Sequence, residues 1–446
     1  MNGIARKLII TFLIVLLPVS LCPGGDDVIV IPEVLEEGET RSVYESLDLF
    51  IRVMELVNEK YVDQVERRDL IEGALQGMLG SLDDYSQFMA PDLYREMQVE
   101  TRGEFGGIGI EITLREGVLT VISPIEGTPA IRAGILPGDR IVEIEGEPTK
   151  GITIFEAVRK LRGEPGDPVS IKVMRIGEAE LLDFTIVRDI IRIESVKDIR
   201  MVNDGIGYIR ITQFQEKTPG DFDRAMEQLL EEGMEALVVD LRWNPGGLLT
   251  SAITVADRFL KKGQLIVETR GRDDQVEMAA RASGRGPYPR IPLAVLINEG
   301  SASGSEIVAG ALRDNYRAVL VGSKTFGKGS VQSVLPLPDD SGLRLTTGRY
   351  YTAGKRAIQE EGVVPDVAVE MTTEEKREFF LRRHRELDEL ENQLRDNEDF
   401  RLEDYYDDPD EETRLDELDP QLRTAVDILK GILIQRFFEE EAGAGS

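Results

Sequence analysis

The chain has 446 residues, more than one hydrophobic core normally organises, and this length predicts about two to four domains. The formal net charge of −30 excludes nucleic acid as a partner, because binding it requires a basic surface. Cys22 is the one cysteine, which excludes an internal disulfide and a thiolate cluster for zinc. The one histidine, His384, lies in a charged helical stretch. If it is an ordinary solvated residue, a Ser-His-Asp triad and a histidine-bound metal are excluded too, and we expect no metal and no cofactor.

Residues 1–22 have the layout of a secretory signal, with basic residues, an apolar run over 8–17 and then Pro18. The run is shorter than the roughly 20 residues of a membrane span. We therefore expect an exported protein of the periplasm or cell envelope, with this segment either cleaved or kept as an anchor. Leu21 is bulky where a lipoprotein signal has a small residue, which disfavours lipidation.

Two further regions precede the first strands. Residues 23–41 are rich in glycine, proline and acid, and are predicted to be a linker. Over residues 42–98 the apolar side chains follow helical spacing, with Leu47, Phe50 and Met54 on one face. This pattern predicts a small helical module that serves for dimerisation or as a cap.

Residues 99–190 switch to a period of two, which indicates a mostly β domain with helices. Strands are predicted at 107–112, 119–122, 169–174 and 182–187, with a helix at 154–161. The segment Ala133-Gly134-Ile135-Leu136-Pro137-Gly138-Asp139-Arg140-Ile141 resembles a PDZ domain of the bacterial, circularly permuted kind.

Residues 191–372 alternate strands with helices, the pattern of an α/β layer fold. A buried strand at 236–241 ends at the turn Asn244-Pro245-Gly246-Gly247. The stretch 270–290 is rich in arginine, glycine and aspartate, and is predicted to be a flap. Residues 373–446 are predicted to be helical and strongly acidic, with a solvated run at 403–412.

Ser303 lies where a buried strand is followed by a helix, in the sequence Ser301-Ala302-Ser303-Gly304-Ser305. Unpaired backbone N–H groups and the positive end of the helix dipole stabilise an oxyanion at such a junction. Helix capping is the competing interpretation, because it is the commonest reason for serine at this position.

Lys328 lies between Gly327 and Gly329 in the turn that follows the next strand. A lysine between glycines can approach the backbone closely and become buried, which lowers its pKa toward the value of about 7 to 8 that a base requires. An exposed loop lysine is the alternative. The turn also approaches the pattern of a phosphate-binding loop, but Gly329 replaces the required Ser or Thr, and Pro336 interrupts the expected helix.

Together these segments resemble the carboxyl-terminal processing, or tail-specific, protease family. The helical module, the PDZ domain and the segments 240–247, 301–305, 325–332 and 362–366 follow the family order and cover about residues 42–371. The resemblance implies a multidomain α/β fold, in which a PDZ domain is inserted into a serine protease core between N- and C-terminal helical segments.

The resemblance also implies roles for single residues. Ser303 would be the nucleophile, Lys328 the base and Gln332 the group that orients the lysine. Backbone N–H groups of Gly304 and of the Gly246-Gly247 turn would form the oxyanion hole. Gly304 departs from the family pattern, in which alanine is usual.

Substrate choice would fall to the PDZ domain. Gly106-Gly107-Ile108-Gly109 resembles its carboxylate-binding loop, which implies protein or peptide substrates with free C-termini. Arg162 is a candidate for signalling that a peptide is bound, although an ordinary surface arginine is an equal interpretation. We expect a homo-oligomer, in the simplest case a dimer, and an adaptor protein is a further candidate partner. A non-catalytic envelope scaffold and a binder of apolar ligands are the competing functions.

Overall fold

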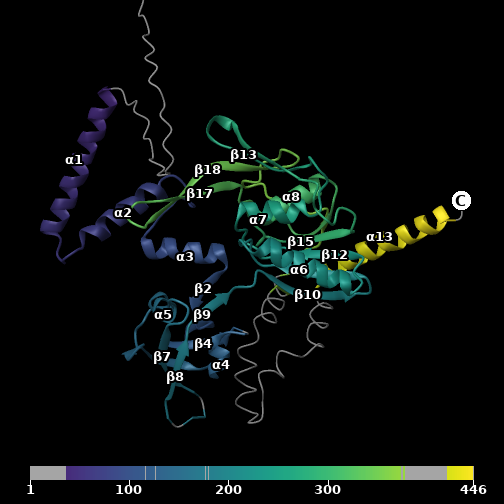
Figure 1. Cartoon of the computed structure of the whole chain (residues 1–446). Coiled ribbons are helices and arrows are strands. Elements are labelled where there is room, and N and C mark those ends of the chain that lie inside the picture. The colour runs from purple at the N-terminus through teal and green to yellow at the C-terminus, as the bar shows by residue number, and fades with distance from the viewer. Residues whose placement is uncertain are drawn as a thin grey trace, which may run out of the picture. The chain divides into compact units, whose positions relative to one another are not determined.

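The computed structural model describes residues 37–115, 117–125, 127–175, 177–178, 180–372, 375–376 and 419–444 (Figure 1). The chain divides into two compact units, residues 1–71 and 72–446. The predicted signal, most of the predicted linker, and most of the acidic region with His384 lie outside the described residues. No helix in the described ranges is both long and apolar enough to cross a membrane.

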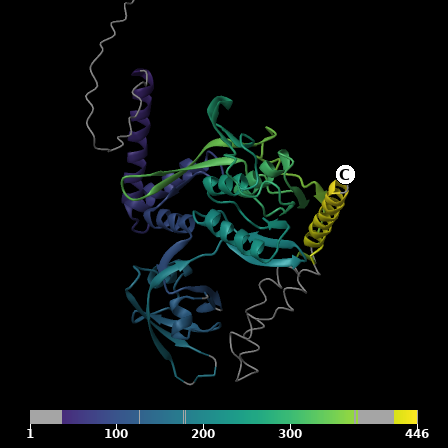
Figure 2. The same ribbon diagram turned by 45° about the vertical axis from the view of Figure 1, so that its right-hand side comes forward.

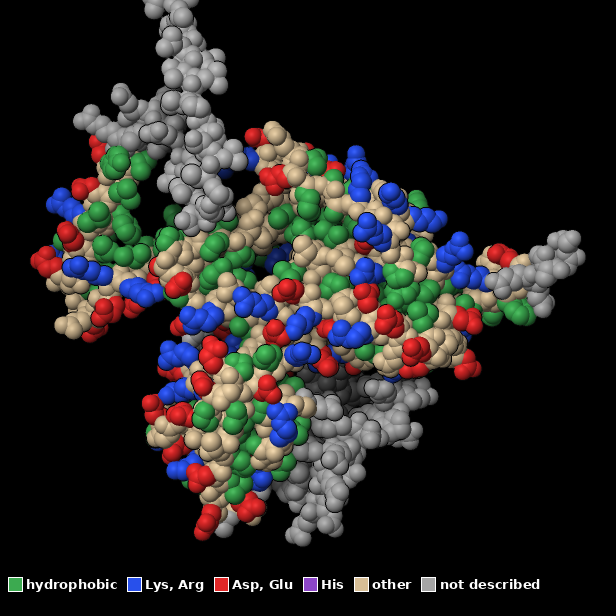
Figure 3. Space-filling view, viewed as in Figure 1, with side chains coloured by type: hydrophobic (Ala, Val, Ile, Leu, Met, Phe, Trp, Pro, Cys, Tyr) green, Lys and Arg blue, Asp and Glu red, His purple; other side chains and the backbone are tan. Residues whose placement is uncertain are grey.

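Two helices begin the described chain, α1 (Glu37–Lys60) and α2 (Arg67–Gly80). The apolar side chains of α1 are not covered, and Figure 3 shows them gathered along this helix. Leu47 is 51% exposed and Phe50 is 42% exposed. Helical spacing here therefore produces an apolar face that has no partner within the described residues of this unit.

The predicted helical module at 42–98 is not helical throughout. Residues Gln87–Met89 form strand β1, which pairs antiparallel with β18 (Gly342–Thr352), and α3 (Pro91–Arg102) follows. Phe88 and Met89 are buried by this pairing. Pro91 begins α3, where its missing N–H needs no partner, so the helical pattern ends at 80 and restarts at 91.

The PDZ region is a sheet of order β3-β4-β5-β7-β8, with β6 paired to β5. Val169, Ile171 and Val173 of β7 are buried while the residues between them are not, as period-two alternation requires. The two strands that enter and leave the domain, β2 (Glu104–Gly107) and β9 (Asp189–Arg192), pair with each other. The other elements are β3 (Ile110–Arg115), β4 (Val118–Pro124), α4 (Pro129–Ala133), β5 (Arg140–Ile144), β6 (Glu147–Pro148), α5 (Ile154–Leu161), β7 (Pro168–Met174) and β8 (Leu182–Val187).

The main sheet of the core has the order β10-β11-β12-β15-β16-β19 and is parallel from β11 onward. Alternate strand residues pack under α6, α7 and α8 on one face and under α13 on the other. Such two-sided burial explains why β12 and β15 are wholly buried. The bounds are β10 (Val196–Asn203), β11 (Ile206–Ile211), α6 (Thr218–Glu231), β12 (Ala236–Asp240), α7 (Leu249–Asp257), β15 (Leu293–Ile297), α8 (Gly304–Asp314), β16 (Val319–Gly322), β19 (Val367–Ala368) and α13 (Pro420–Ala444).

A second sheet has the order β1-β18-β13-β14, and β17 (Ser330–Pro336) also pairs with β18. Figure 2 shows β17 and β18 as a long hairpin. The predicted flap at 270–290 contains the end of β13 (Leu265–Arg270) and all of β14 (Val276–Arg281). It therefore contains a paired strand, and its opening stays a prediction.

Candidate active site

Ser303 is the residue immediately before α8, at the carboxyl edge of the main sheet. Its φ of +53° and ψ of −110° are strained values for a residue with a side chain. Such a conformation persists only where its surroundings hold it. The Ser303 N–H donates a hydrogen bond to Glu306 Oε2 at 2.8 Å, which supplies part of that hold.

The two neighbouring serines have structural partners. The Ser301 hydroxyl donates to the carbonyl of Leu241 at 2.8 Å, and the Ser305 hydroxyl donates to the carbonyl of Asn244 at 3.0 Å. Both serines are completely buried, whereas Ser303 is partly exposed. Ser301 and Ser305 thus fasten the 241–247 turn to the serine segment, and Ser303 is the serine that a substrate can reach.

The turn at Gly246 and Gly247 lies directly against the serine. A Cβ atom on Gly246 would lie 2.7 Å from Ser303 Cβ and 2.8 Å from the Gly304 nitrogen. Both glycines have positive φ, +103° and +136°, which favours glycine independently of space. The approach explains the Gly-Gly pair: a side chain on Gly246 would push the two segments apart.

The three predicted oxyanion donors are not equivalent. The Gly246 N–H donates to Asn244 Oδ1 at 2.8 Å and is therefore occupied. Within the described residues, no hydrogen bond engages the N–H groups of Gly247 and Gly304. These two N–H groups are available to an oxyanion, whereas that of Gly246 is not. Gly246 would contribute only the close approach to Ser303 that its missing side chain permits.

Glu306 is a central residue that the sequence interpretation missed. It is fully buried, and its two carboxylate oxygens accept four hydrogen bonds. Oε2 accepts from the backbone N–H groups of Ser303 and Lys328, at 2.8 and 2.9 Å. Oε1 accepts from the Thr325 hydroxyl and the Gly327 N–H, at 2.6 and 2.8 Å. Burial raises the pKa of Glu306, and these four bonds partly oppose the rise.

Lys328 is partly buried in the turn between β16 and β17. Its Nζ lies 4.8 Å from the centre of the Tyr85 ring, and no hydrogen bond joins it to Ser303 Oγ. Burial, and secondarily the charge of Arg344, lowers the pKa of Lys328 below that of an ordinary lysine. The shift favours the neutral amine, which is the form that can accept a proton.

Gln332 lies on β17, shortly after the lysine turn. Its Nε2 donates to Thr346 Oγ1 at 2.8 Å and to Ser330 Oγ at 3.2 Å. Its Oε1 is buried and has no hydrogen-bond partner among the described residues. A buried acceptor without a donor is costly, and a lysine amine is a group that would satisfy it.

A buried charge cluster fixes the turn that leads to Gly246. Arg242 is 2% exposed and pairs with Asp240 at 2.7 Å and with Asp419 at 2.6 Å. Burial alone would lower the pKa of Arg242, but the two carboxylates raise it well above its ordinary value. Asp419 immediately precedes α13, so the C-terminal helix is bonded to the segment that leads to the Gly246-Gly247 turn.

In the PDZ region, Gly107, Ile108, Gly109 and Arg162 line one cavity of about 60 Å³ between β3 and α5. Gly106 is not among the lining residues, and its carbonyl accepts the Gly163 N–H at 3.1 Å. Arg162 pairs with Glu96 of α3 at 3.4 Å and stacks on Phe105 at 4.4 Å. The structure thus gathers four of the five predicted substrate residues, and their roles stay predictions.

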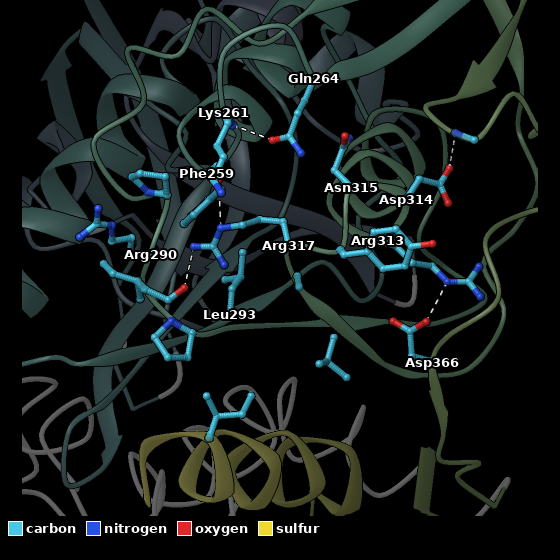
Figure 4. A pocket seen from close by; sticks show the side chains of 18 of the residues that line it. Phe259, Lys261, Gln264, Arg290, Leu293, Arg313, Asp314, Asn315, Arg317 and Asp366 are labelled. Atoms are coloured by element: carbon cyan, nitrogen blue, oxygen red, sulfur yellow. Dashed lines mark hydrogen bonds and ion pairs between the residues drawn. The ribbon is translucent and has the colours of Figure 1, made fainter. Parts of the chain in front are cut away.

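The large cavity in Figure 4, of about 1080 Å³, lies elsewhere and is lined by none of the site residues predicted from the sequence. Its Arg317 donates to the carbonyls of Phe259, Tyr288 and Ile291. Cavity size therefore does not mark the site that the sequence predicts. The described ranges contain no group of three or more His, Cys, Asp or Glu side chains that could hold a metal.

Comparisons with known proteins agree with this arrangement. Residues 205–369 match peptidase family S41, residues 106–186 match a PDZ domain, and residues 31–92 match the N-terminal domain of the activating protease CtpB. A carboxy-terminal-processing protease of Bartonella bacilliformis is 44% identical over 78% of this chain and 80% of its own length. The carboxy-terminal processing protease CtpB of Bacillus subtilis is 35% identical over 73% of this chain and 68% of its own length.

Among solved structures, a photosystem II D1 C-terminal processing protease is 29% identical, with a TM-score of 0.43, and the match covers 72% of this chain and 92% of that one. The two sequence relatives cover enough of both chains at sufficient identity to decide the family. The chain therefore belongs to the carboxy-terminal processing proteases of peptidase family S41, with a PDZ domain, and is a hydrolase that acts on peptide bonds.

Proposed function

We propose that this protease cleaves peptide bonds through an acyl-enzyme on Ser303, with Lys328 as its base. The observation that carries the proposal is the shared acceptor Glu306 Oε2, which bonds the backbone nitrogens of both residues. One buried oxygen atom thus fixes the nucleophile and the base relative to each other. The lowered pKa of Lys328 supports the role of a neutral amine.

The proposed reaction has two halves, formation of the acyl-enzyme and its hydrolysis. The Lys328 amine takes the proton of the Ser303 hydroxyl while Oγ bonds to the substrate carbonyl carbon, and the carbonyl oxygen becomes an oxyanion. The N–H groups of Gly247 and Gly304 donate to that oxyanion. The C–N bond then breaks, the leaving amine receives the proton from Lys328, and water hydrolyses the ester by the same exchange. Gln332 Oε1 accepts a hydrogen bond from the lysine at its working position.

Substrate selection is proposed to rest on the PDZ groove. Backbone N–H groups around Gly107 and Gly109 would receive a C-terminal carboxylate while the peptide pairs along β3. Arg162 lies in the same groove and is tied to α3 through Glu96. A peptide bound in the groove would therefore act on α3 through the ion pair of Arg162 and Glu96.

Location and assembly are proposed from the N-terminal part. The signal-like residues 1–22 support export to the periplasm or envelope. The uncovered apolar side chains of α1 support pairing with a second copy of the chain. An adaptor protein remains a candidate partner.

A pair of peptides tests the substrate proposal. Two peptides of one unstructured sequence, with a free or an amidated C-terminus, would be incubated with the enzyme, and cleavage sites read by mass spectrometry. We expect cleavage of the free acid to have the lower KM, because the amide lacks the charge that the groove would bind. Equal KM values would contradict tail recognition, and the Ser303→Ala variant controls for contaminating proteases.

A further inference from the structure

Residues 83–86, directly before β1, contact Lys328 through the ring of Tyr85. Asp83 Oδ1 accepts hydrogen bonds from the backbone N–H groups of Tyr85 and Ser86, at 2.8 and 2.7 Å. Arg344 Nε donates to the Tyr85 carbonyl at 3.2 Å. These bonds fix the Tyr85 backbone from both sides, and so fix the point from which its ring extends.

The Tyr85 ring faces the Lys328 amine. At 4.8 Å from the ring centre, Nζ is within the range of a cation–π interaction, which stabilises the charged ammonium over the neutral amine. No hydrogen bond or ion pair to Nζ accompanies this contact in the described part of the chain. The ring therefore opposes burial and the charge of Arg344, which lower the pKa of Lys328 and favour the neutral amine.

The same segment also reaches Gln332. The Thr346 N–H donates to Ser86 Oγ at 3.1 Å, and Gln332 Nε2 donates to Thr346 Oγ1 at 2.8 Å. These bonds aim the Gln332 amide while its Oε1 stays without a partner. The Lys328 amine therefore contacts the Tyr85 ring. Gln332 Oε1, in the hydrogen-bond network that includes Ser86 and Thr346, has no donor among the described residues.

We infer that Tyr85 is a positioning residue for the base. Its ring holds the Lys328 side chain in the resting arrangement and stabilises its charged form, and turnover requires the amine to leave the ring for Gln332 Oε1 and Ser303 Oγ. This inference rests on the proposed Ser303–Lys328 mechanism. The charged or titratable groups around the lysine are Arg344 from β18, Glu306 beneath its backbone, and Asp83 with Tyr85 itself in the segment before β1.

The test is the pH dependence of kcat/KM for Tyr85→Leu. Leucine keeps apolar cover but has no ring to stabilise the ammonium, so the pKa of Lys328 should fall. We expect the acidic limb of the profile to move about 0.5 to 1 unit toward lower pH, with roughly three- to tenfold faster cleavage below the wild-type limb. Tyr85→Phe keeps the ring and should keep the limb in place, whatever its maximal rate.

A second variant guards against loss of folding in Tyr85→Leu. Asp83→Ala removes the acceptor that fixes the Tyr85 backbone and leaves the ring, so the limb should shift in the same direction by a smaller amount. Thermal melting checks that each variant is folded.

Three outcomes overturn the inference or its basis, and they are distinguishable. An unchanged limb in folded Tyr85→Leu means that the ring holds no charge. A limb moved to higher pH means that the ring only excludes water. If Lys328→Ala cleaves at the wild-type rate, the proposed mechanism itself fails, whatever the Tyr85 variants do.

Discussion

The proposed nucleophile side, around Ser303, and the proposed base side, around Lys328, are built differently. On the nucleophile side, Ser301, Ser305, Glu306 and the Arg242 cluster bond the backbone of two segments in a buried setting. On the base side, the backbone of Lys328 is equally fixed, but its amine rests on a ring and Gln332 Oε1 is unpaired.

The difference shows which half of the chemistry is preorganised. An oxyanion hole must be in place before charge develops, because reorganisation during the reaction would cost free energy. A general base needs to change its protonation state and partner in each cycle. A backbone held by buried hydrogen bonds around Ser303, and a Lys328 amine with no hydrogen-bond partner among the described residues, thus suit the two proposed roles.

The largest expected effect comes from Glu306→Gln. This change replaces the carboxylate whose Oε2 bonds the backbone of both Ser303 and Lys328. The glutamine oxygen would still accept hydrogen bonds from two of the four groups that donate to Glu306. Its N–H₂ group would face the other two, which are donors themselves, so those two bonds would be lost. Losing two charge-assisted hydrogen bonds at roughly 1.5 kcal/mol each or more predicts at least a ~100-fold lower kcat/KM. Steady-state cleavage assays measure it, with exposed Glu231→Gln on α6 as the matched control. A loss below tenfold would show that the two sides do not depend on this carboxylate.

Next in size is Asp419→Asn, which weakens only the nucleophile side. Arg242 would keep Asp240 but lose the second charge that compensates its burial. Breaking a buried ion pair from one side predicts a loss of about 3 kcal/mol in the free energy of unfolding. Urea denaturation measures this loss, and Asp427→Asn on the exposed side of α13 is the control. An effect within error of that control would mean that α13 does not support the oxyanion turn.

The smallest expected effect is Arg344→Gln, which changes only the base side. Arg344 lowers the pKa of Lys328, so removing its charge raises that pKa. Because the neutral amine is the base, the acidic limb of kcat/KM should move to higher pH, by less than about one unit. The direction is opposite to that expected for Tyr85→Leu. Exposed Arg349→Gln, on the same strand, controls for general charge effects, and a shift to lower pH would contradict the assignment.

Local sequence patterns identified much of this molecule. The helix predicted at 154–161 has the observed bounds, and the structure shows a capping box of Thr153 and Glu156 at its start. The strand-to-helix junction before Ser303 and the glycine turn around Lys328 were visible for similar local reasons. Strand patterns predict several strands of the PDZ sheet and of the main core sheet, but they do not predict the hairpin of β17 and β18.

Long-range pairing explains what the sequence did not reveal. Glu306 resembles an ordinary first-turn glutamate until the 325–328 turn folds over it. Strand β1 lies in a stretch of helical spacing and becomes a strand only by pairing with β18. Tyr85 and Asp419 likewise meet the site through residues far along the chain, and no local pattern reports such contacts.

The most direct test of the Ser303–Lys328 assignment is labelling by a fluorophosphonate probe, located by mass spectrometry of digested protein. The account predicts a single adduct on Ser303, formed faster as pH rises, with at least a ~100-fold slower rate in Lys328→Ala. An adduct on another residue, or a Lys328→Ala variant that is labelled at the wild-type rate, would contradict it.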